Sequence, residues 1–130
     1  MLTKPTFASA SLLCALLLPN IALANNDHNG HELVQDVHKQ GTRIEFEEDQ
    51  DEVYDAVQSG LIRPFSELYD AIESQLHGRV IKVELEEDDD EWIYELKLVH
   101  DNNVIKVEYN ATTLEMIEIK GRNLQNVIKK

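Results

Sequence analysis

The sequence predicts an α+β domain in which one or two helices pack on an antiparallel meander of three or four β-strands. Two observations predict this fold class. Apolar residues recur at helical spacing between Pro64 and Leu76, and beyond Gly78 the apolar period changes to two. Turn-forming residues separate the later apolar runs at short intervals, which favours hairpins and therefore an antiparallel sheet.

The first 24 residues have the features of a secretory signal peptide. Lys4 precedes an apolar run from Phe7 to Leu18, and Ala22-Leu23-Ala24 forms an A-x-A site before the polar Asn25. An uncleaved anchor is the alternative, but the apolar run is shorter than the roughly 20 residues that span a bilayer. We expect cleavage between Ala24 and Asn25, a periplasmic or secreted protein, and no membrane insertion after processing.

Residues 25–44 are predicted to form a polar flexible leader, with a short helical turn around residues 32–39, ahead of a domain at residues 45–130. The leader carries the candidate metal ligands His28, His31 and His38. Asn29-Gly30 lies between the first two histidines and disfavours a helix that would bring them to one face. Polar leaders of exported proteins often contain histidines, so a metal site and a plain leader both stay open.

Two helices are predicted in the domain. Six of the eight residues 45–52 are acidic, which suits the positive end of a helix over residues 51–58 that Gly60 ends. A second helix begins after Pro64, and Gly78 ends it. Its apolar stripe consists of Phe65, Leu68, Tyr69, Ile72 and Leu76.

The strands are predicted at residues 81–86, 92–99, 105–109 and 116–120. Their apolar residues alternate with charged ones, so one face of the sheet is buried under the second helix. The other face suggests opposite charges paired across strands rather than an apolar docking surface, and it carries Lys82, Glu84, Glu95, Lys97, Lys106 and Glu108. Dimerisation through an exposed strand edge is an alternative way to complete the fold.

The charge of the chain restricts its partners. It has 25 acidic and 12 basic residues, a net charge of −13, which becomes −14 once Lys4 is removed with the signal peptide. Such a surface repels nucleic acid and anionic lipid and favours cations. The single cysteine, Cys14, lies in the signal peptide, so the processed chain can form no disulfide.

The acidic turn at the first predicted hairpin is the main candidate for partner binding. Seven of the eight residues 84–91 are acidic, and Glu87, Asp88, Asp89, Asp90 and Glu91 would form a charged finger for a basic peptide or receptor. A solvated turn that discourages edge-to-edge aggregation is the alternative. Trp92 and Tyr94 are predicted to be core residues, because Leu96 and Leu98 continue their stripe.

No catalytic site and no cofactor site is predicted. The sequence has no G-x-S-x-G, H-E-x-x-H or phosphate-binding loop, and no Cys/His pair. The acidic runs lack the glycine and the distal glutamate of an EF-hand calcium loop. We therefore expect a protein that binds or regulates rather than an enzyme.

Four segments carry recognisable motifs: Ile62–Leu68 (I-R-P-F-S-E-L), Gly78–Glu86 (G-R-V-I-K-V-E-L-E), Trp92–Leu96 (W-I-Y-E-L) and Asn110–Met116 (N-A-T-T-L-E-M). In this order they resemble the PepSY domain family. The resemblance covers residues 62–121. Asn110 stands where the family has Asp, and Leu114 stands where it has Gly, which leaves the register of the last strand open.

The resemblance implies a non-catalytic inhibitor, chaperone-like or sensing module that acts on an extracytoplasmic protein, either a protease or a sensor kinase. PepSY-like domains occur in propeptides of secreted metallopeptidases and as small periplasmic proteins. The second hypothesis, from the residues alone, is a cation-responsive protein that binds metal or a basic peptide through its acidic clusters and histidines.

Overall fold

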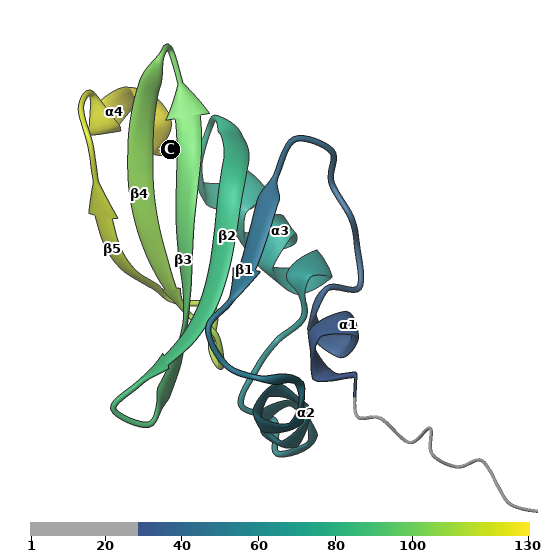
Figure 1. Cartoon of the computed structure of the whole chain (residues 1–130). Helices are drawn as coiled ribbons and strands as arrows, with labels where there is room; N and C mark the ends of the chain where they lie inside the picture. Colours follow the sequence, from purple (N-terminus) through teal and green to yellow (C-terminus); the bar gives the residue numbers. More distant parts are fainter. Residues whose placement is uncertain (1–28) are drawn as a thin grey trace, which may run out of the picture.

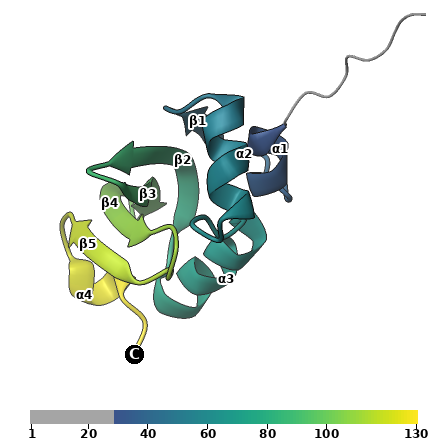
Figure 2. The same ribbon diagram turned by 90° about the horizontal axis from the view of Figure 1, so that it is seen from below.

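The computed structural model describes residues 29–130. The predicted signal peptide, its cleavage position between Ala24 and Asn25, and His28 lie outside these residues. The described chain has an α+β fold with helices on a five-stranded sheet, as Figures 1 and 2 show. Its elements are α1 (Gly30–Val34), β1 (Arg43–Phe46), α2 (Gln50–Gln58), α3 (Phe65–Gln75), β2 (Arg79–Asp88), β3 (Glu91–His100), β4 (Asn103–Asn110), β5 (Met116–Lys120) and α4 (Leu124–Val127).

The predicted antiparallel meander is confirmed for β2 to β5, but the sheet is mixed rather than purely antiparallel. The strand order is β1-β2-β3-β4-β5, and β1 pairs with β2 in parallel. The chain crosses from β1 to β2 through α2 and α3, which is how two parallel strands can be neighbours. The prediction missed β1 because this strand has four residues and runs directly into the acidic segment.

Helix α3 covers the buried face of the sheet, as predicted. Phe65 and Leu68 are fully buried, and the other members of its stripe, Tyr69, Ile72 and Leu76, are almost so. The buried hydroxyls of the sheet's tyrosines bond to this layer: Tyr94 donates to the Arg63 carbonyl at 2.5 Å. The Tyr109 hydroxyl donates to Gln75 Oε1 at 2.7 Å. Burial raises the pKa of Tyr109 to about 12.

The described part of the predicted leader, residues 29–44, packs on the domain. Val34 of α1 is 1% exposed, and Figure 1 shows α1 against α2. The Asp36 carboxylate accepts hydrogen bonds from the Ser66 amide at 2.9 Å and the Ser66 hydroxyl at 2.6 Å. It thereby caps α3, whose own N-cap residue, Pro64, offers no side-chain bond. Here the structure differs from a flexible leader that ends at residue 44, and residue 45 lies inside β1.

The hairpin turns lie where turn residues predict them. Asp89 and Asp90 join β2 to β3 with φ of 53° and 67°, and Asp101 and Asn102 join β3 to β4 with φ of 49° and 64°. Two consecutive positive φ values are typical of the two-residue turns that suit the twist of a hairpin. Asp and Asn adopt this conformation more readily than other non-glycine residues.

The register of the last strand is now defined. Leu114 has a φ of 62°, so the position where the family has Gly does take the left-handed conformation. Lys106 pairs with Lys120, and Tyr109 pairs with Met116 after an irregularity that follows Glu108. Beyond β5 the chain forms α4, and the Val127 carbonyl accepts from the His77 amide at 2.7 Å. The last residues therefore close the C-terminal end of α3.

The charges on the exposed face of the sheet are arranged differently from the prediction. Residues directly opposite each other carry like charges, as in Lys97 with Lys106 and Glu95 with Glu108. The opposite-charge contacts instead run along one strand or diagonally between strands. Lys82 lies 3.8 Å from Glu84 on its own strand, and Lys106 lies 3.7 Å from Glu95 on the neighbouring strand.

Candidate functional site

The predicted acidic finger is the tip of the β2–β3 hairpin. Asp88 pairs with Glu91 at the last step of the ladder, and Asp89 and Asp90 form the turn. All of the residues from Glu87 to Glu91 are exposed. Figure 1 shows this hairpin reaching past the other strands, on the side of the molecule where α2 lies. The structure therefore presents the tip to solvent.

The second acidic run of the sequence meets this hairpin at α2. Asp49 caps the helix by accepting from the Glu52 amide at 2.9 Å, which fixes the orientation of its first turn. Glu48, Glu52 and Glu87 thereby come together, with carboxylate oxygens within 4.8 Å of one another. We call these three residues the α2 triad. They come from segments more than thirty positions apart in the sequence.

A groove runs beside the α2 triad, between α2 and the turn end of the β2–β3 hairpin. Its volume is about 270 Å³, and we call it the acidic groove; it is lined by Glu52, Asp55, Ala56, Ser59, Leu61, Glu87 and Trp92. Trp92, predicted to be a core residue, is 4% exposed, whereas Leu61 is 41% exposed. The groove therefore combines acidic side chains with apolar surface.

The carboxylates around the groove repel one another. The pKa of Glu52 is raised, first by partial desolvation and then by the negative charges of Asp49, Glu48 and Glu87. Among residues 29–130, no basic side chain forms an ion pair with the α2 triad. A cationic group placed in the groove would relieve this repulsion.

The sheet residues that line this groove, Glu87 and Trp92, lie in a segment that matches a known protein family. Residues 64–120 match the family model described as "Peptidase propeptide and YPEB domain", PepSY. This stretch of the chain is similar to PepSY domains. The match runs from the start of α3 to the end of β5 and confirms the predicted resemblance. No curated protein and no solved structure matches the chain.

The acidic groove joins the PepSY segment to the helix before it. Glu87 and Trp92 belong to the PepSY segment, whereas Glu52, Asp55 and Ala56 come from α2, which precedes the match. Both acidic runs are evident in the sequence, but their proximity is not. The signal that was missed is the alternation in Arg43–Phe46, since pairing of β1 with β2 is what brings residue 48 next to residue 87.

A second carboxylate group lies on the other face of the sheet. Glu45, Glu47 and Glu84 have oxygens within 4.8 Å of one another. The pKa of Glu84 is raised, first by a hydrogen bond with Glu47 and then by burial, while Lys82 acts in the opposite direction. A hydrogen bond between two carboxyl groups forms only when one of them is protonated, so it favours the protonated form of Glu84.

The predicted histidine ligands have other contacts. His31 stacks on Phe46 with ring centroids 4.0 Å apart, and its Nε2 lies 2.9 Å from the Glu48 carbonyl oxygen. His38 is exposed, and its Nδ1 lies 3.1 Å from Gln35 Nε2. Neither histidine lies in either of the two clusters of three carboxylates described above. His31 thus fastens α1 to β1.

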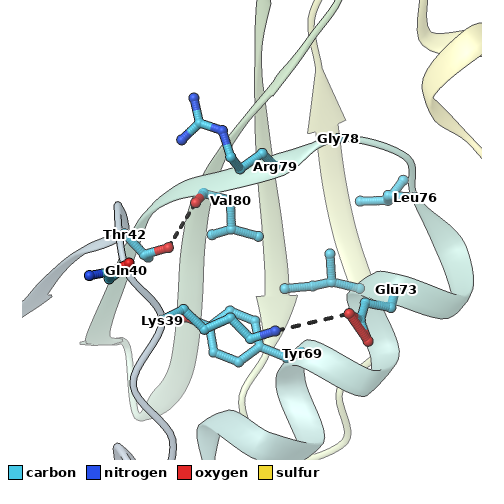
Figure 3. A pocket seen from close by; sticks show the side chains of 10 residues that line it. Lys39, Gln40, Thr42, Tyr69, Glu73, Leu76, Gly78, Arg79 and Val80 are labelled. Carbon is cyan, nitrogen blue, oxygen red and sulfur yellow. Dashed lines mark hydrogen bonds and ion pairs between the residues drawn. The ribbon is translucent and has the colours of Figure 1, made fainter.

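A further cavity, of about 250 Å³, lies at the opposite end of α3, and Figure 3 shows the side chains around it. Lys39 Nζ lies over the Tyr69 ring, 4.8 Å from its centroid, and 4.0 Å from Glu73. Thr42 donates its hydroxyl proton to the Val80 carbonyl at 2.8 Å. The Tyr69 hydroxyl lies buried near Thr42 without a hydrogen bond of normal geometry. Its burial raises the pKa of Tyr69, and the Thr42 hydroxyl lowers it to a smaller extent.

None of the described helices is long and apolar enough to cross a membrane.

Proposed function

We propose that this protein is a non-catalytic regulatory module of the periplasm or the secreted fraction, and that its acidic groove binds a basic segment of a protein partner. The partner is a protease or a sensor protein. The proposal extends the PepSY match, whose description names a peptidase propeptide, to a protein partner bound at the acidic groove.

The convergence of two acidic runs on one groove carries the proposal. Acidic residues spread over a surface serve solubility, but here Glu52, Asp55 and Glu87 surround apolar surface of Ala56, Leu61 and Trp92. Lysine and arginine side chains have an apolar stem and a cationic head. A stem lying on Leu61 would place the head among the three carboxylates.

The exposed hairpin tip adds a longer-range attraction. Glu87 to Glu91 lie beside the groove and carry five negative charges without a basic neighbour in the same segment. Such a field speeds the encounter with a basic partner and weakens as salt is added. The tip therefore attracts the partner, and the groove holds it.

Affinity capture tests the proposed partner. The processed protein is immobilised and exposed to the native extracytoplasmic fraction, and we expect one dominant protease or sensor protein to be retained. A variant with Glu52→Gln, Asp55→Asn and Glu87→Gln should lose it. The control variant Glu32→Gln, Asp70→Asn and Glu115→Gln removes the same charge from exposed positions elsewhere and should retain it. Equal capture by the two variants would remove the groove from the proposal.

A second candidate function is cation sensing, which the two carboxylate groups favour because each holds three oxygens within 4.8 Å. Calorimetry of the processed protein with calcium, zinc and copper tests it. Stoichiometric binding at micromolar concentration or tighter, lost in Glu47→Gln with Glu84→Gln or in Glu48→Gln with Glu52→Gln, would support it. The control variant Glu32→Gln with Asp70→Asn keeps both carboxylate groups and should bind like the unmodified protein. Binding heats in the two group variants that equal those of this control would reject the function.

A further inference from the structure

Two rows of like charge cross the whole exposed face of the sheet. The basic row contains one residue from each strand in turn, Arg43, Lys82, Lys97, Lys106 and Lys120, and each is directly opposite the next. The acidic row, two residues further along each strand, contains Glu45, Glu84, Glu95, Glu108 and Glu118, in the same register. The two rows balance each other in charge, and Glu86 adds one further acid on this face beyond the acidic row.

The sequence order of the charges produces these rows. The order is K-x-E in β2 and β4 but E-x-K in β3 and β5, so it reverses wherever neighbouring strands are antiparallel. In β1, which is parallel to β2, the order R-x-E is not reversed. A constant order would have placed opposite charges across from each other, which is the more stable arrangement in an isolated sheet.

The rows leave unsatisfied charge at the centre of the face. Lys97 and Glu108, on the two inner strands β3 and β4, form no ion pair within residues 29–130, although their neighbours Glu95 and Lys106 do. Burial and the negative charge of Glu118 raise the pKa of Glu108, and the positive charge of Lys106 acts in the opposite direction. Ion pairs between the two rows, such as Lys82 with Glu84 and Lys120 with Glu118, therefore relieve only part of the repulsion between like charges within one molecule.

A face with this pattern is complementary to itself. A two-fold axis that lies in the plane of the face, parallel to the rows and midway between them, places the basic row of one copy on the acidic row of the other. Each strand then lies antiparallel on the same strand of the second copy. Lys97 meets the second copy's acidic row at Glu95, and Glu108 meets its basic row at Lys106.

We propose that the exposed face of the sheet is a self-association surface that binds a second copy of this chain face to face, in a salt-sensitive dimer. This surface is distinct from the acidic groove, which lies on the opposite face of the sheet beside α2. It is also distinct from dimerisation through a strand edge, because no ladder is extended.

The remaining surface of the face agrees with this arrangement. Val99 and Val104 form a neighbouring pair beyond the basic row, and Val104 is 57% exposed. The two-fold axis also puts the two acidic hairpin tips at opposite ends of the dimer, which limits the repulsion between two strongly negative molecules.

The dimer should be weak and should depend on ionic strength. Five strands spaced by about 4.8 Å give a face of modest width, at the low end of the area that stable interfaces bury. The twist of both sheets further concentrates the contact on the central strands. Association should therefore be detectable at high protein concentration in low salt, and the dissociation constant should rise about tenfold or more in about 0.5 M salt.

Sedimentation equilibrium with charge-row variants tests the proposal. The variant Glu95→Lys with Glu108→Lys makes the central face basic, and the variant Lys97→Glu with Lys106→Glu makes it acidic. We expect the unmodified protein to dimerise in low salt and each variant alone to stay monomeric. An equimolar mixture of the two variants should form a heterodimer. Circular dichroism shows whether each variant is folded.

Controls with the same change of net charge lie off the face. Glu32→Lys with Asp70→Lys, and Arg122→Glu with Lys130→Glu, alter exposed positions and should leave dimerisation intact. Should the reversed variants fail to fold, the neutral pair Lys97→Gln with Lys106→Gln replaces them and should weaken association. A protein that stays monomeric in low salt overturns the proposal, and so does a dimer that is unaffected by salt and by all face variants, which would indicate an edge contact.

Discussion

At the scale of single residues, two tyrosines in the same core make different contributions. Tyr94 is fully buried and donates to the Arg63 carbonyl, whereas Tyr69 is 4% exposed and its hydroxyl has no partner among the described residues. A buried polar group without a hydrogen bond opposes folding, because it has lost its bond to water. The hydroxyl of Tyr69 therefore destabilises the folded state, and the hydroxyl of Tyr94 stabilises it.

Removing each hydroxyl should change stability in opposite directions. We expect Tyr69→Phe to leave the free energy of unfolding unchanged or to raise it by up to about 1 kcal/mol, and Tyr94→Phe to lower it by about 1 kcal/mol. Urea unfolding followed by circular dichroism measures both. A loss of stability in Tyr69→Phe as large as that in Tyr94→Phe would mean that Tyr69 has a bound water or another partner.

The sequence predicted which residues are buried better than it predicted their bonds. The stripe from Phe65 to Leu76 and the alternation through Trp92 and Tyr94 follow from periodicity, and the structure confirms them. The bond from Asp36 to Ser66 joins residues thirty positions apart. Nothing in the local sequence around Asp36 marks it as the cap of a distant helix, so this contact needed the fold.

At the scale of elements, the main difference from the prediction lies before α2. The alternation of Ile44 and Phe46 is too short to distinguish a strand from a loop, and the acids that follow suit a helix start equally well. Strand β1 becomes stable only once β2 is present as its neighbour. Likewise α1 has five residues, too few to be helical alone, and depends on its contact with α2.

The contact between α1 and α2 depends on the small size of Gly30. A methyl group at this position would lie 2.4 Å from the Gln50 carbonyl oxygen and 2.4 Å from the Tyr54 amide nitrogen. We expect Gly30→Ala to lower the free energy of unfolding by roughly 1–3 kcal/mol, the usual cost of overpacking, or to detach α1. Leu33→Ala, on the exposed side of α1, should change it by less than about 0.5 kcal/mol. Amide hydrogen exchange of residues 30–46 separates the two outcomes, and equal effects of the two variants would contradict the packing of α1.

The β2–β3 turn should become more stable when one of its aspartates is replaced. Asp90 has a φ of 67° and lies among other acids, so Asp90→Gly removes both the strained conformation and a repulsive charge. We expect a gain of about 0.5–1 kcal/mol in the free energy of unfolding. Glu91→Gly, at the first residue of β3, should be destabilising instead. A loss in Asp90→Gly would show that the Asp90 side chain makes a bond that holds the turn.

At the scale of the whole molecule, negative charge is concentrated rather than evenly spread. The fold places acids around the groove, at the hairpin tip and in a row across the exposed face. Burial and neighbouring carboxylates raise the pKa values of Glu84, Glu86 and Glu108, with a shared hydrogen bond as the first cause for Glu84. These carboxylates therefore hold protons to a higher pH in the folded state than in the unfolded chain.

Stability should therefore fall as pH rises. An acid with a raised folded pKa contributes stability that is fully present below the unfolded pKa, about 4.3 for Glu, and that is lost as pH passes the folded pKa. We expect the thermal unfolding midpoint to be higher near pH 5 than near pH 8, with a smaller difference in high salt. The variant Glu84→Gln, Glu86→Gln, Glu108→Gln should flatten the profile. An unfolding midpoint that rises over this range would contradict the assignment.

Binding of a basic peptide tests the central claim most directly, namely that two distant acidic runs form one binding groove. Fluorescence anisotropy of a labelled Lys-Leu-Arg-Leu peptide is compared for the unmodified protein, for Glu52→Gln with Asp55→Asn and Glu87→Gln, and for Glu32→Gln with Asp70→Asn and Glu115→Gln. We predict that the groove variant loses about tenfold or more in affinity. The equal-charge control should lose only the small, salt-dependent part due to net charge. Equal losses in the two variants would mean that the peptide responds to net charge alone and that the groove is not a binding site.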